Sequence, residues 1–390
     1  MNRPPVVVFS GGGTGGHLYP ALALAAALEE RRPDVKPLFV GAERGIEARI
    51  LPERGLRHLL VRVEGLRRGP FLANLGVLAL MTRATWQVAE AFRRVRPQLT
   101  VVTGGYAGGP AGLAAILTRT RLVLQEQNSL PGVTTRVLAP HAREIHLAFP
   151  EALRALPRGA RRRAAFSGNP IRPPVRPPRR EAAAALGVDP ASRIVLVTGG
   201  SQGSRALNRI VLEVVRGVRA GELERPAGLE LFWVTGLSEL PEVEAGLEAS
   251  GSPRWVRAVG YTDEMPLALS LAEVAVSRAG AMTTSELLAY GVPSVLVPLP
   301  TAAADHQTRN ALALHEAGAA LHLREENATG ADLWSLLDPL LRDRRLRGEM
   351  AAAARRRGRP FAAREIAASI AKLLPKPAAG LAARAAGVVP

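Results

Sequence analysis

Two glycine-rich turns, one in each half of the chain, constrain its fold more than any other feature. The first covers residues 10–17 (SGGGTGGH) and the second covers 198–204 (TGGSQGS). Each follows a short aliphatic run, at 6–9 (VVVF) and 194–197 (IVLV), and each precedes a helix-like segment. A strand, a glycine turn and a helix together aim backbone N–H groups at an anion, most often a phosphate. The pair predicts two nucleotide-type domains with a cleft between them.

Short aliphatic runs alternate with alanine- and leucine-rich segments in both halves, which predicts an α/β protein of two Rossmann-like, doubly wound parallel sheets. Five prolines in residues 169–180 predict the linker between them. We expect domains over 1–165 and 166–345, terminal helices over 346–375 and a disordered tail over 376–390. The strands are expected at 6–9, 38–41, 100–103, 122–124, 145–149, 194–197, 231–234, 256–259, 274–277 and 294–298. The helices are expected at 20–30, 109–117, 204–218, 283–290, 308–317 and 333–374.

Composition narrows the function. The chain has no cysteine, which excludes a disulfide framework, a thiolate metal site and a cysteine nucleophile. No signal peptide and no apolar run of about 18 residues is visible, so no transmembrane helix is expected. Of the net charge of +17, residues 1–165 carry +13, which suits an anionic substrate or membrane surface, although arginine-rich codon usage explains the total charge equally well. Only 4% of residues are aromatic and no nucleic-acid-binding module is present, so no nucleic-acid partner is expected.

The glycine turns also fit other motifs formally. Residues 11–16 satisfy G-x-G-x-x-G, so an NAD-dependent dehydrogenase is one alternative, although Glu43 stands late for the acidic residue of that fingerprint. The Walker pattern fails, because His17 and Leu18 stand where lysine and serine or threonine are needed. Residues 199–203 satisfy the hydrolase G-x-S-x-G elbow, but this turn opens a new domain after a proline-rich linker, which disfavours a hydrolase.

Four polar sites are candidates for chemistry. His17 ends the first turn at the start of a helix, whose positive end favours a neutral imidazole able to accept a proton; alternatively it only packs or hydrogen-bonds. In residues 278–286, hydroxyls suit a phosphate and Glu286 suits a ribose diol, although Thr283 with Glu286 also has the spacing of a helix capping box. Residues 125–128 (QEQN) follow a buried strand, where ligands bind in open α/β sheets or where a polar loop lies. Arg172 follows the expected end of the first domain, where its side chain can either reach a ligand or remain in solvent.

The segment 65–87 has apolar residues at helical spacing beside arginines, which suits a helix lying on a membrane surface; core packing explains the apolar stripe equally well. The residues assigned to such a surface are Arg67, Arg68, Phe71, Leu75 and Trp86.

Seven motifs in a fixed order carry a resemblance. They are GGTGGH at 12–17, GGYAGGP at 104–110, EQN at 126–128, GNPIR at 168–172, GGSQG at 199–203, RAGAMTTSE at 278–286 and DHQT at 305–308. In this order they closely resemble the MurG family, the bacterial UDP-N-acetylglucosamine:undecaprenyl-pyrophosphoryl-muramoylpentapeptide N-acetylglucosaminyltransferases that complete lipid II. The family usually has a histidine before Glu-Gln-Asn, where this chain has Gln125, so no base is expected there. His306 lies where some relatives carry glutamine.

The resemblance implies a GT-B glycosyltransferase whose first domain takes lipid I and whose second takes UDP-N-acetylglucosamine, with the final helices crossing back to the first domain. It implies inverting transfer to the C4 hydroxyl of the muramoyl pentapeptide, with His17 as the base, no metal and no other cofactor. It also implies a peripheral protein on the anionic cytoplasmic face of the inner membrane. A UDP-N-acetylglucosamine 2-epimerase of the same fold is the related alternative. The donor contacts implied are Thr14, Gly15, Gly16, Asn128, Arg172, Ser201, Thr262, Ala281, Met282, Thr283, Thr284, Ser285, Glu286 and Gln307. Gly104, Gly105 and Tyr106 are assigned to the acceptor side.

Overall fold

The computed structural model describes residues 4–65, 74–200 and 202–377, which form two compact units. The first unit comprises residues 1–172 and 361–390, and the second comprises 173–360. The division at 172/173 falls inside the proline-rich segment, whose residues 167–178 contain no helix or strand. It lies seven residues beyond the boundary expected from the sequence, because the strand that ends at Phe166 still pairs in the first sheet and residues 167–169 after it still hydrogen-bond to residues of the first unit.

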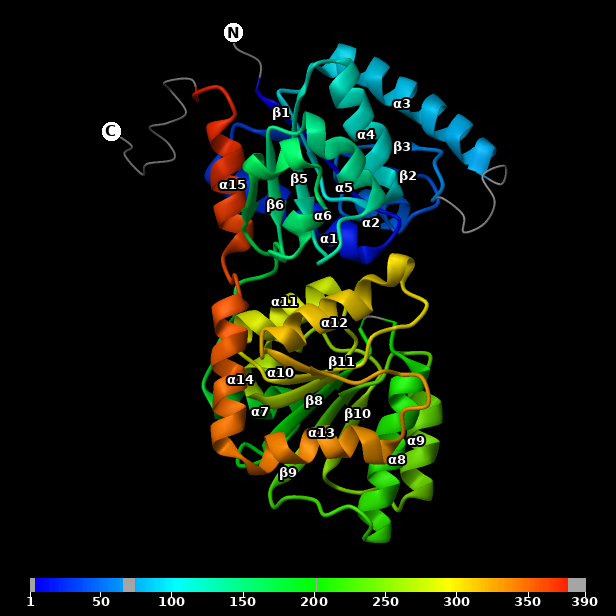
Figure 1. The fold of residues 1–390 in the computed structure, drawn as a ribbon, viewed down its shortest axis with the longest axis vertical. Coiled ribbons are helices and arrows are strands. Elements are labelled where there is room, and N and C mark those ends of the chain that lie inside the picture. The colour runs from blue at the N-terminus through cyan, green and yellow to red at the C-terminus, as the bar shows by residue number, and fades with distance from the viewer. Residues whose placement is uncertain (1–3, 66–73, 201, 378–390) are drawn as a thin grey trace. The chain divides into compact units, whose positions relative to one another are not determined.

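The first unit is built on a seven-stranded, all-parallel sheet in the order β3-β2-β1-β4-β5-β6-β7 (Figure 1). Its strands are β1 Val6–Ser10, β2 Lys36–Ala42, β3 His58–Val61, β4 Leu99–Val102, β5 Arg121–Glu126, β6 Glu144–Leu147 and β7 Ala164–Phe166. Its helices are α1 Gly15–Arg31, α2 Glu47–Glu53, α3 Leu75–Val95, α4 Gly105–Leu117, α5 Val133–Leu138, α6 Ala152–Ala155 and α15 Ala362–Lys372. The strand order reverses between β1 and β4, so the loops after these two strands diverge and leave room for a ligand.

Alternate residues of β1 feed two cores. Val7 and Phe9 belong to a cluster with α1 and α15, whereas Val8 belongs to a cluster with α3 and α4. Ile366 and Ile370 of α15 are fully buried in the α1 cluster. The last described helix is therefore an integral part of the first unit (Figure 1).

The second unit has a six-stranded, all-parallel sheet in the order β10-β9-β8-β11-β12-β13, reversing between β8 and β11. Its strands are β8 Arg193–Thr198, β9 Leu229–Val234, β10 Val256–Val259, β11 Ala272–Ser277, β12 Ser294–Leu296 and β13 Ala320–His322. Its helices are α7 Arg179–Leu186, α8 Arg205–Ala220, α9 Leu240–Ala249, α10 Met265–Leu271, α11 Ala281–Tyr290, α12 His306–Glu316, α13 Gly330–Arg342 and α14 Arg344–Arg357. The predicted fold class, two doubly wound parallel-sheet domains, is confirmed. That they face each other across a cleft stays a prediction.

The helical stretch expected over 333–374 is broken twice. Asp343 ends α13 and caps α14, accepting hydrogen bonds from the backbone N–H groups of Arg345 and Leu346 at 2.8 and 3.1 Å. α14 packs on α11 in the second unit, and a Cβ on Gly358 would lie 2.6 Å from the Leu288 carbonyl oxygen. The part that belongs to the first unit therefore begins at Phe361, not at residue 346. Of the predicted tail over 376–390, residues 378–390 lie outside the described residues.

Candidate active site

The reversal point of the first sheet holds His17. It is the third residue of α1, directly after the β1 turn, and its ring lies against the glycines that follow β4. A Cβ on Gly104 would lie 3.1 Å from His17 Nδ1, and one on Gly105 would lie 2.1 Å from the Gly12 carbonyl oxygen. Both glycines have positive φ, +92° and +71°. Two glycines are therefore needed for the chain to pass this close to the imidazole.

Hydrogen bonds orient the His17 ring. Nδ1 lies 3.0 Å from the Thr103 carbonyl oxygen and 2.8 Å from Oε1 of Gln127. A backbone carbonyl can only accept, so Nδ1 carries the proton that it donates. In the neutral ring the lone pair is then on Nε2, which is the nitrogen able to take a proton from a substrate.

The first glycine turn already holds an anion, the carboxylate of Glu47, which sequence reasoning missed. Glu47 is fully buried. Its oxygens accept the Gly13 N–H at 3.0 and 3.1 Å, and Oε1 accepts the Ala42 N–H at 2.9 Å. A Cβ on Gly12 or Gly45 would lie within 2.4 Å of Oε1. The turn thus wraps around the chain's own carboxylate rather than around a phosphate. The detectable signal was a glutamate that closely follows the glycines at 41 and 45.

The predicted contacts around His17 lie at the same edge. Thr14 precedes α1 in extended conformation and is exposed, with Gly15 and Gly16 opening the helix. The ring of Tyr106 packs on Gly13 and Gly65, since a Cβ there would approach it to 2.3 and 3.3 Å. Burial, with lesser contributions from Glu47 and Glu64, raises the pKa of the Tyr106 phenol.

Asn128 lies in a loop organised by the buried Glu126. The Glu126 carboxylate accepts hydrogen bonds from the backbone N–H groups of Asn128 and Gly132, each at 3.1 Å, and from the Thr135 hydroxyl at 2.6 Å. Glu126 is therefore a structural residue, which leaves the half-buried Asn128 as the member of the QEQN segment able to meet a ligand. Arg172 is exposed and is the last residue of the N-terminal segment of the first unit.

The second glycine turn is open where the first is filled. Gly200 has φ +89°, and a Cβ built on it would meet nothing within 4 Å. Gly203 is tightly packed, because a Cβ there would lie 2.1 Å from the Thr235 carbonyl oxygen. Ser204 caps α8, its hydroxyl accepting the Leu207 N–H at 3.3 Å. The predicted donor contact Ser201 lies outside the described residues.

The start of α11 is a second open position beside this turn in the sheet. The helix begins at Ala281 after Gly280, whose Cβ position has nothing within 4 Å. Met282 and Thr283 lie in its first turn, so Thr283 is not the N-cap and the capping-box alternative is wrong. The Thr284 and Ser285 hydroxyls donate back to the carbonyls of Gly280 and Ala281, at 3.0 and 2.7 Å. The backbone at the helix start, rather than these hydroxyls, is therefore suited to an anion.

Two predicted donor contacts organise neighbouring loops. Thr262, after β10, accepts the Glu264 N–H at 3.0 Å, and Gln307, in α12, accepts the Leu299 N–H at 3.0 Å through Oε1. These residues, Gly200 and the start of α11 all follow carboxyl ends of parallel strands, which lie at one edge of the sheet. Glu286 is half-buried in the second turn of α11.

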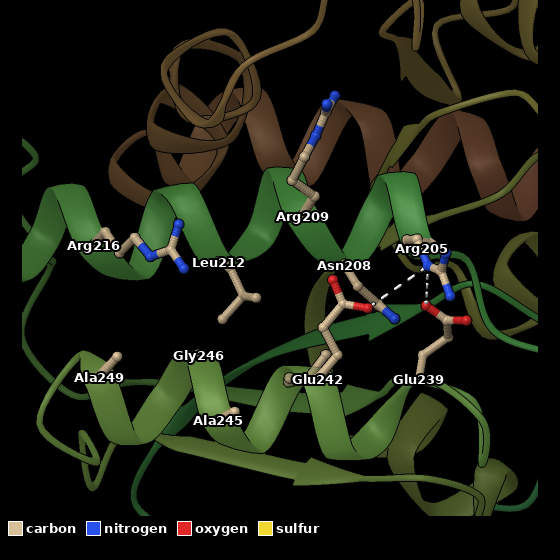
Figure 2. A pocket seen from close by; sticks show the side chains of 11 residues that line it. Arg205, Asn208, Arg209, Leu212, Arg216, Glu239, Glu242, Ala245, Gly246 and Ala249 are labelled. Carbon is tan, nitrogen blue, oxygen red and sulfur yellow. Dashed lines mark hydrogen bonds and ion pairs between the residues drawn. The ribbon is translucent and has the colours of Figure 1, made fainter.

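A hollow of about 400 Å³ lies between α8 and α9 (Figure 2). The arginines that line it could bind an anion, but Arg205 already forms ion pairs with Glu239 at 3.2 Å and with Glu242 at 3.6 Å. None of the predicted donor contacts that the structure describes lines it.

The predicted membrane-facing residues are partly described. Arg67, Arg68 and Phe71 lie outside the described residues. On α3, Leu75, Leu78 and Trp86 are 49%, 43% and 55% exposed, while the buried face of the helix is made by other residues. These three side chains are not core residues. Among the described helices none is both long and apolar enough to cross a membrane, and the described residues contain no cluster of three potential metal ligands.

Both halves of the chain match a known protein family. Residues 7–147 match the N-terminal domain of glycosyltransferase family 28, and residues 194–374 match its C-terminal domain. The chain is similar to two enzymes named UDP-N-acetylglucosamine–N-acetylmuramyl-(pentapeptide) pyrophosphoryl-undecaprenol N-acetylglucosamine transferase. The one from Chlorobaculum parvum is 41% identical over 94% of this chain and 99% of its own length. The one from Desulfitobacterium hafniense is 37% identical over 92% and 97%.

Solved structures agree. The crystal structure of Acinetobacter baumannii MurG is 28% identical, with a TM-score of 0.76 over 95% of this chain and 100% of that one. A Listeria monocytogenes protein described as a UDP-N-acetylglucosamine 2-epimerase is 17% identical with a TM-score of 0.65, which shows a shared fold only. The relatives do not favour the epimerase or dehydrogenase alternatives. This chain is a glycosyltransferase and belongs to the MurG family of N-acetylglucosaminyltransferases.

Proposed function

We propose that this protein moves N-acetylglucosamine from UDP-N-acetylglucosamine to the C4 hydroxyl of the muramoyl pentapeptide of lipid I, with His17 as the general base. The observation that carries the base assignment is the pair of acceptors on His17 Nδ1, which leaves the Nε2 lone pair for a substrate hydroxyl.

The step is a displacement at the anomeric carbon. His17 Nε2 takes the hydroxyl proton while the C4 oxygen forms a bond to that carbon. The bond from the anomeric carbon to the UDP oxygen breaks, UDP leaves with the electron pair, and the configuration inverts. Charge develops on the diphosphate, so backbone N–H groups and a helix N-terminus stabilise the leaving group.

We assign the donor to the open edge of the second sheet. Gly200 and Gly280 leave room for phosphates to approach the backbone, and α11 directs its positive end there. In this assignment Glu286 holds the ribose, Thr262 the uracil and Gln307 the sugar. The second glycine turn contributes Ser201. The first unit contributes Thr14, Gly15, Gly16, Asn128 and Arg172.

We assign the exposed face of α3 to the anionic cytoplasmic surface of the inner membrane, where a lipid-linked acceptor resides. Leu75, Leu78 and Trp86 provide apolar contact, and the first unit carries most of the positive charge. Trp86→Ser with Leu78→Ser is expected to weaken association with phosphatidylglycerol-containing vesicles about tenfold. Flotation of the vesicles on a density gradient measures the bound fraction of each variant. The control is Leu237→Ser, which removes a leucine that is 73% exposed in the second unit. Equal binding by all variants would contradict the assignment.

The base assignment is tested by UDP release with and without a lipid I analogue. His17→Ala is expected to lower turnover about 10²- to 10⁴-fold, because proton removal in the transition state is lost, while the Kd for UDP stays within about twofold. His58→Ala, an exposed histidine on β3, is the matched control. Turnover by His17→Ala at the control's rate would exclude His17 as the base. UDP release that does not need the acceptor would exclude the transfer itself.

A further inference from the structure

Three buried carboxamides continue from His17 into the first unit, and two of them, Gln125 and Asn169, have no part in the catalytic step or in donor binding. Gln127 Oε1 accepts from His17 Nδ1 at 2.8 Å, and Gln127 Nε2 in turn donates to Gln125 Oε1. Gln125 Nε2 donates to Asn169 Oδ1 at 3.0 Å. Gln125, Gln127 and Asn169 are at most 1% exposed. Although Asn169 lies 44 residues beyond Gln125 in the sequence, the three side chains form one line of hydrogen bonds that ends on the imidazole.

Backbone carbonyls fix the direction of this line. Gln127 Nε2 also faces the Gln125 carbonyl oxygen at 3.0 Å, and Asn169 Nδ2 faces the Gln127 carbonyl oxygen at 3.2 Å. Carbonyls only accept, so the NH₂ end of each amide is determined. Asn169 must then present Oδ1 to Gln125, and Gln127 must present Oε1 to His17. Reversing any one amide would place two donors or two acceptors opposite each other, and these buried groups would lose their hydrogen bonds.

We propose that Gln125, Gln127 and Asn169 form a positioning relay that holds the proton of His17 on Nδ1. Which imidazole nitrogen carries the proton is set by the hydrogen bond that the other makes, so an acceptor of fixed orientation selects the tautomer with a basic Nε2. Gln127 touches the imidazole and Gln125 acts through Gln127. The consequence for turnover rests on the proposed role of His17 as base, but the tautomer itself can be measured without substrate.

The test is two-bond ¹H–¹⁵N correlation spectroscopy of the full chain labelled at histidine nitrogens, with His17 assigned through His17→Gln. The wild type is expected to show a neutral His17 protonated on Nδ1. Gln125→Leu removes both the acceptor of Gln127 and the donor to Asn169, so a population protonated on Nε2 is expected to appear. Turnover is expected to fall about tenfold while the Kd for UDP is unchanged. Gln125→His is expected to restore the Nδ1–H signal, because a neutral imidazole also offers one acceptor and one donor.

Two further variants keep the proposal testable if Gln125→Leu does not fold. Gln127→Met removes the amide next to the imidazole and is expected to shift the tautomer in the same direction. Gln98→Leu removes a glutamine that accepts the Val6 N–H at 2.7 Å elsewhere in the first unit, and it should leave the His17 signals unchanged.

A wild-type His17 protonated on Nε2 would overturn the relay. So would an Nδ1–H signal that survives both Gln125→Leu and Gln127→Met, because the Thr103 carbonyl would then suffice. A tautomer shift without loss of turnover would uphold the relay and reject His17 as the base.

Discussion

The turn after β1 and the turn after β8 occupy equivalent places, each between a strand and a helix at the point where its sheet reverses order. In the first, Gly13 donates to the buried carboxylate of Glu47 and the following glycines pack against protein atoms. In the second, Gly200 borders open space. The same motif therefore serves two purposes. A glycine turn that holds an internal carboxylate is a rigid mount for a side chain, here His17, whereas an open one can receive a ligand's phosphates.

The difference also limits what the first turn can bind. A phosphate at the Gly13 N–H would have to displace a carboxylate that already holds Gly13 and Ala42, and it would lie beside that negative charge. The lipid-linked diphosphate of the acceptor is therefore not expected to bind in this turn. The hydroxyl that reacts needs no anion site, which is consistent with a turn that ends in His17, the proposed base.

The largest expected effect tests whether Glu47 holds the first turn together. Glu47→Leu leaves the part-buried N–H of Gly13 and the buried N–H of Ala42 without acceptors, at about 1–3 kcal/mol each. The free energy of unfolding, measured by urea denaturation, tests this. Glu47→Gln keeps one acceptor oxygen and is expected to lose less than half as much. A Glu47→Leu protein as stable as the wild type would remove the distinction between a filled and an open turn.

The second prediction concerns the glycines that contact His17. Gly105→Ala places a Cβ 2.1 Å from the Gly12 carbonyl oxygen at a φ of +71°, so the β4 turn must move away from the imidazole. Turnover with a lipid I analogue is expected to fall about tenfold to a hundredfold. Gly132→Ala, where φ is −63° and nothing lies within 4 Å, is the matched control. Similar turnover in both variants would show that the close packing on His17 is dispensable.

The sequence predicted the central parts of this arrangement better than its edges. Buried strands such as β1 and β8 are continuous aliphatic runs, whereas β3, β7 and β13 have three or four residues at or near sheet edges and give no such signal. His17 stood out because it ends a glycine turn. Glu47 and Gln127 contact that turn or His17 from 34 and 110 residues away, and a polar residue at such a distance reads as exposed until the fold is known.

The smallest expected effect tests the open turn and its neighbour, α11. Gly280→Val fills space that borders the N-terminus of the helix, where we place the diphosphate, and φ at this position is −64°, which valine tolerates. The unfolding midpoint should change little, because the side chain meets no protein atom, while the affinity for UDP falls about tenfold as the phosphates lose their approach to the backbone. Calorimetric titration with UDP measures this. Gly348→Val, with equally open space in α14, is the control for adding the same side chain to the second unit. If Gly280→Val binds UDP as tightly as Gly348→Val does, the diphosphate does not reach this helix, and the open position on the second sheet has another use.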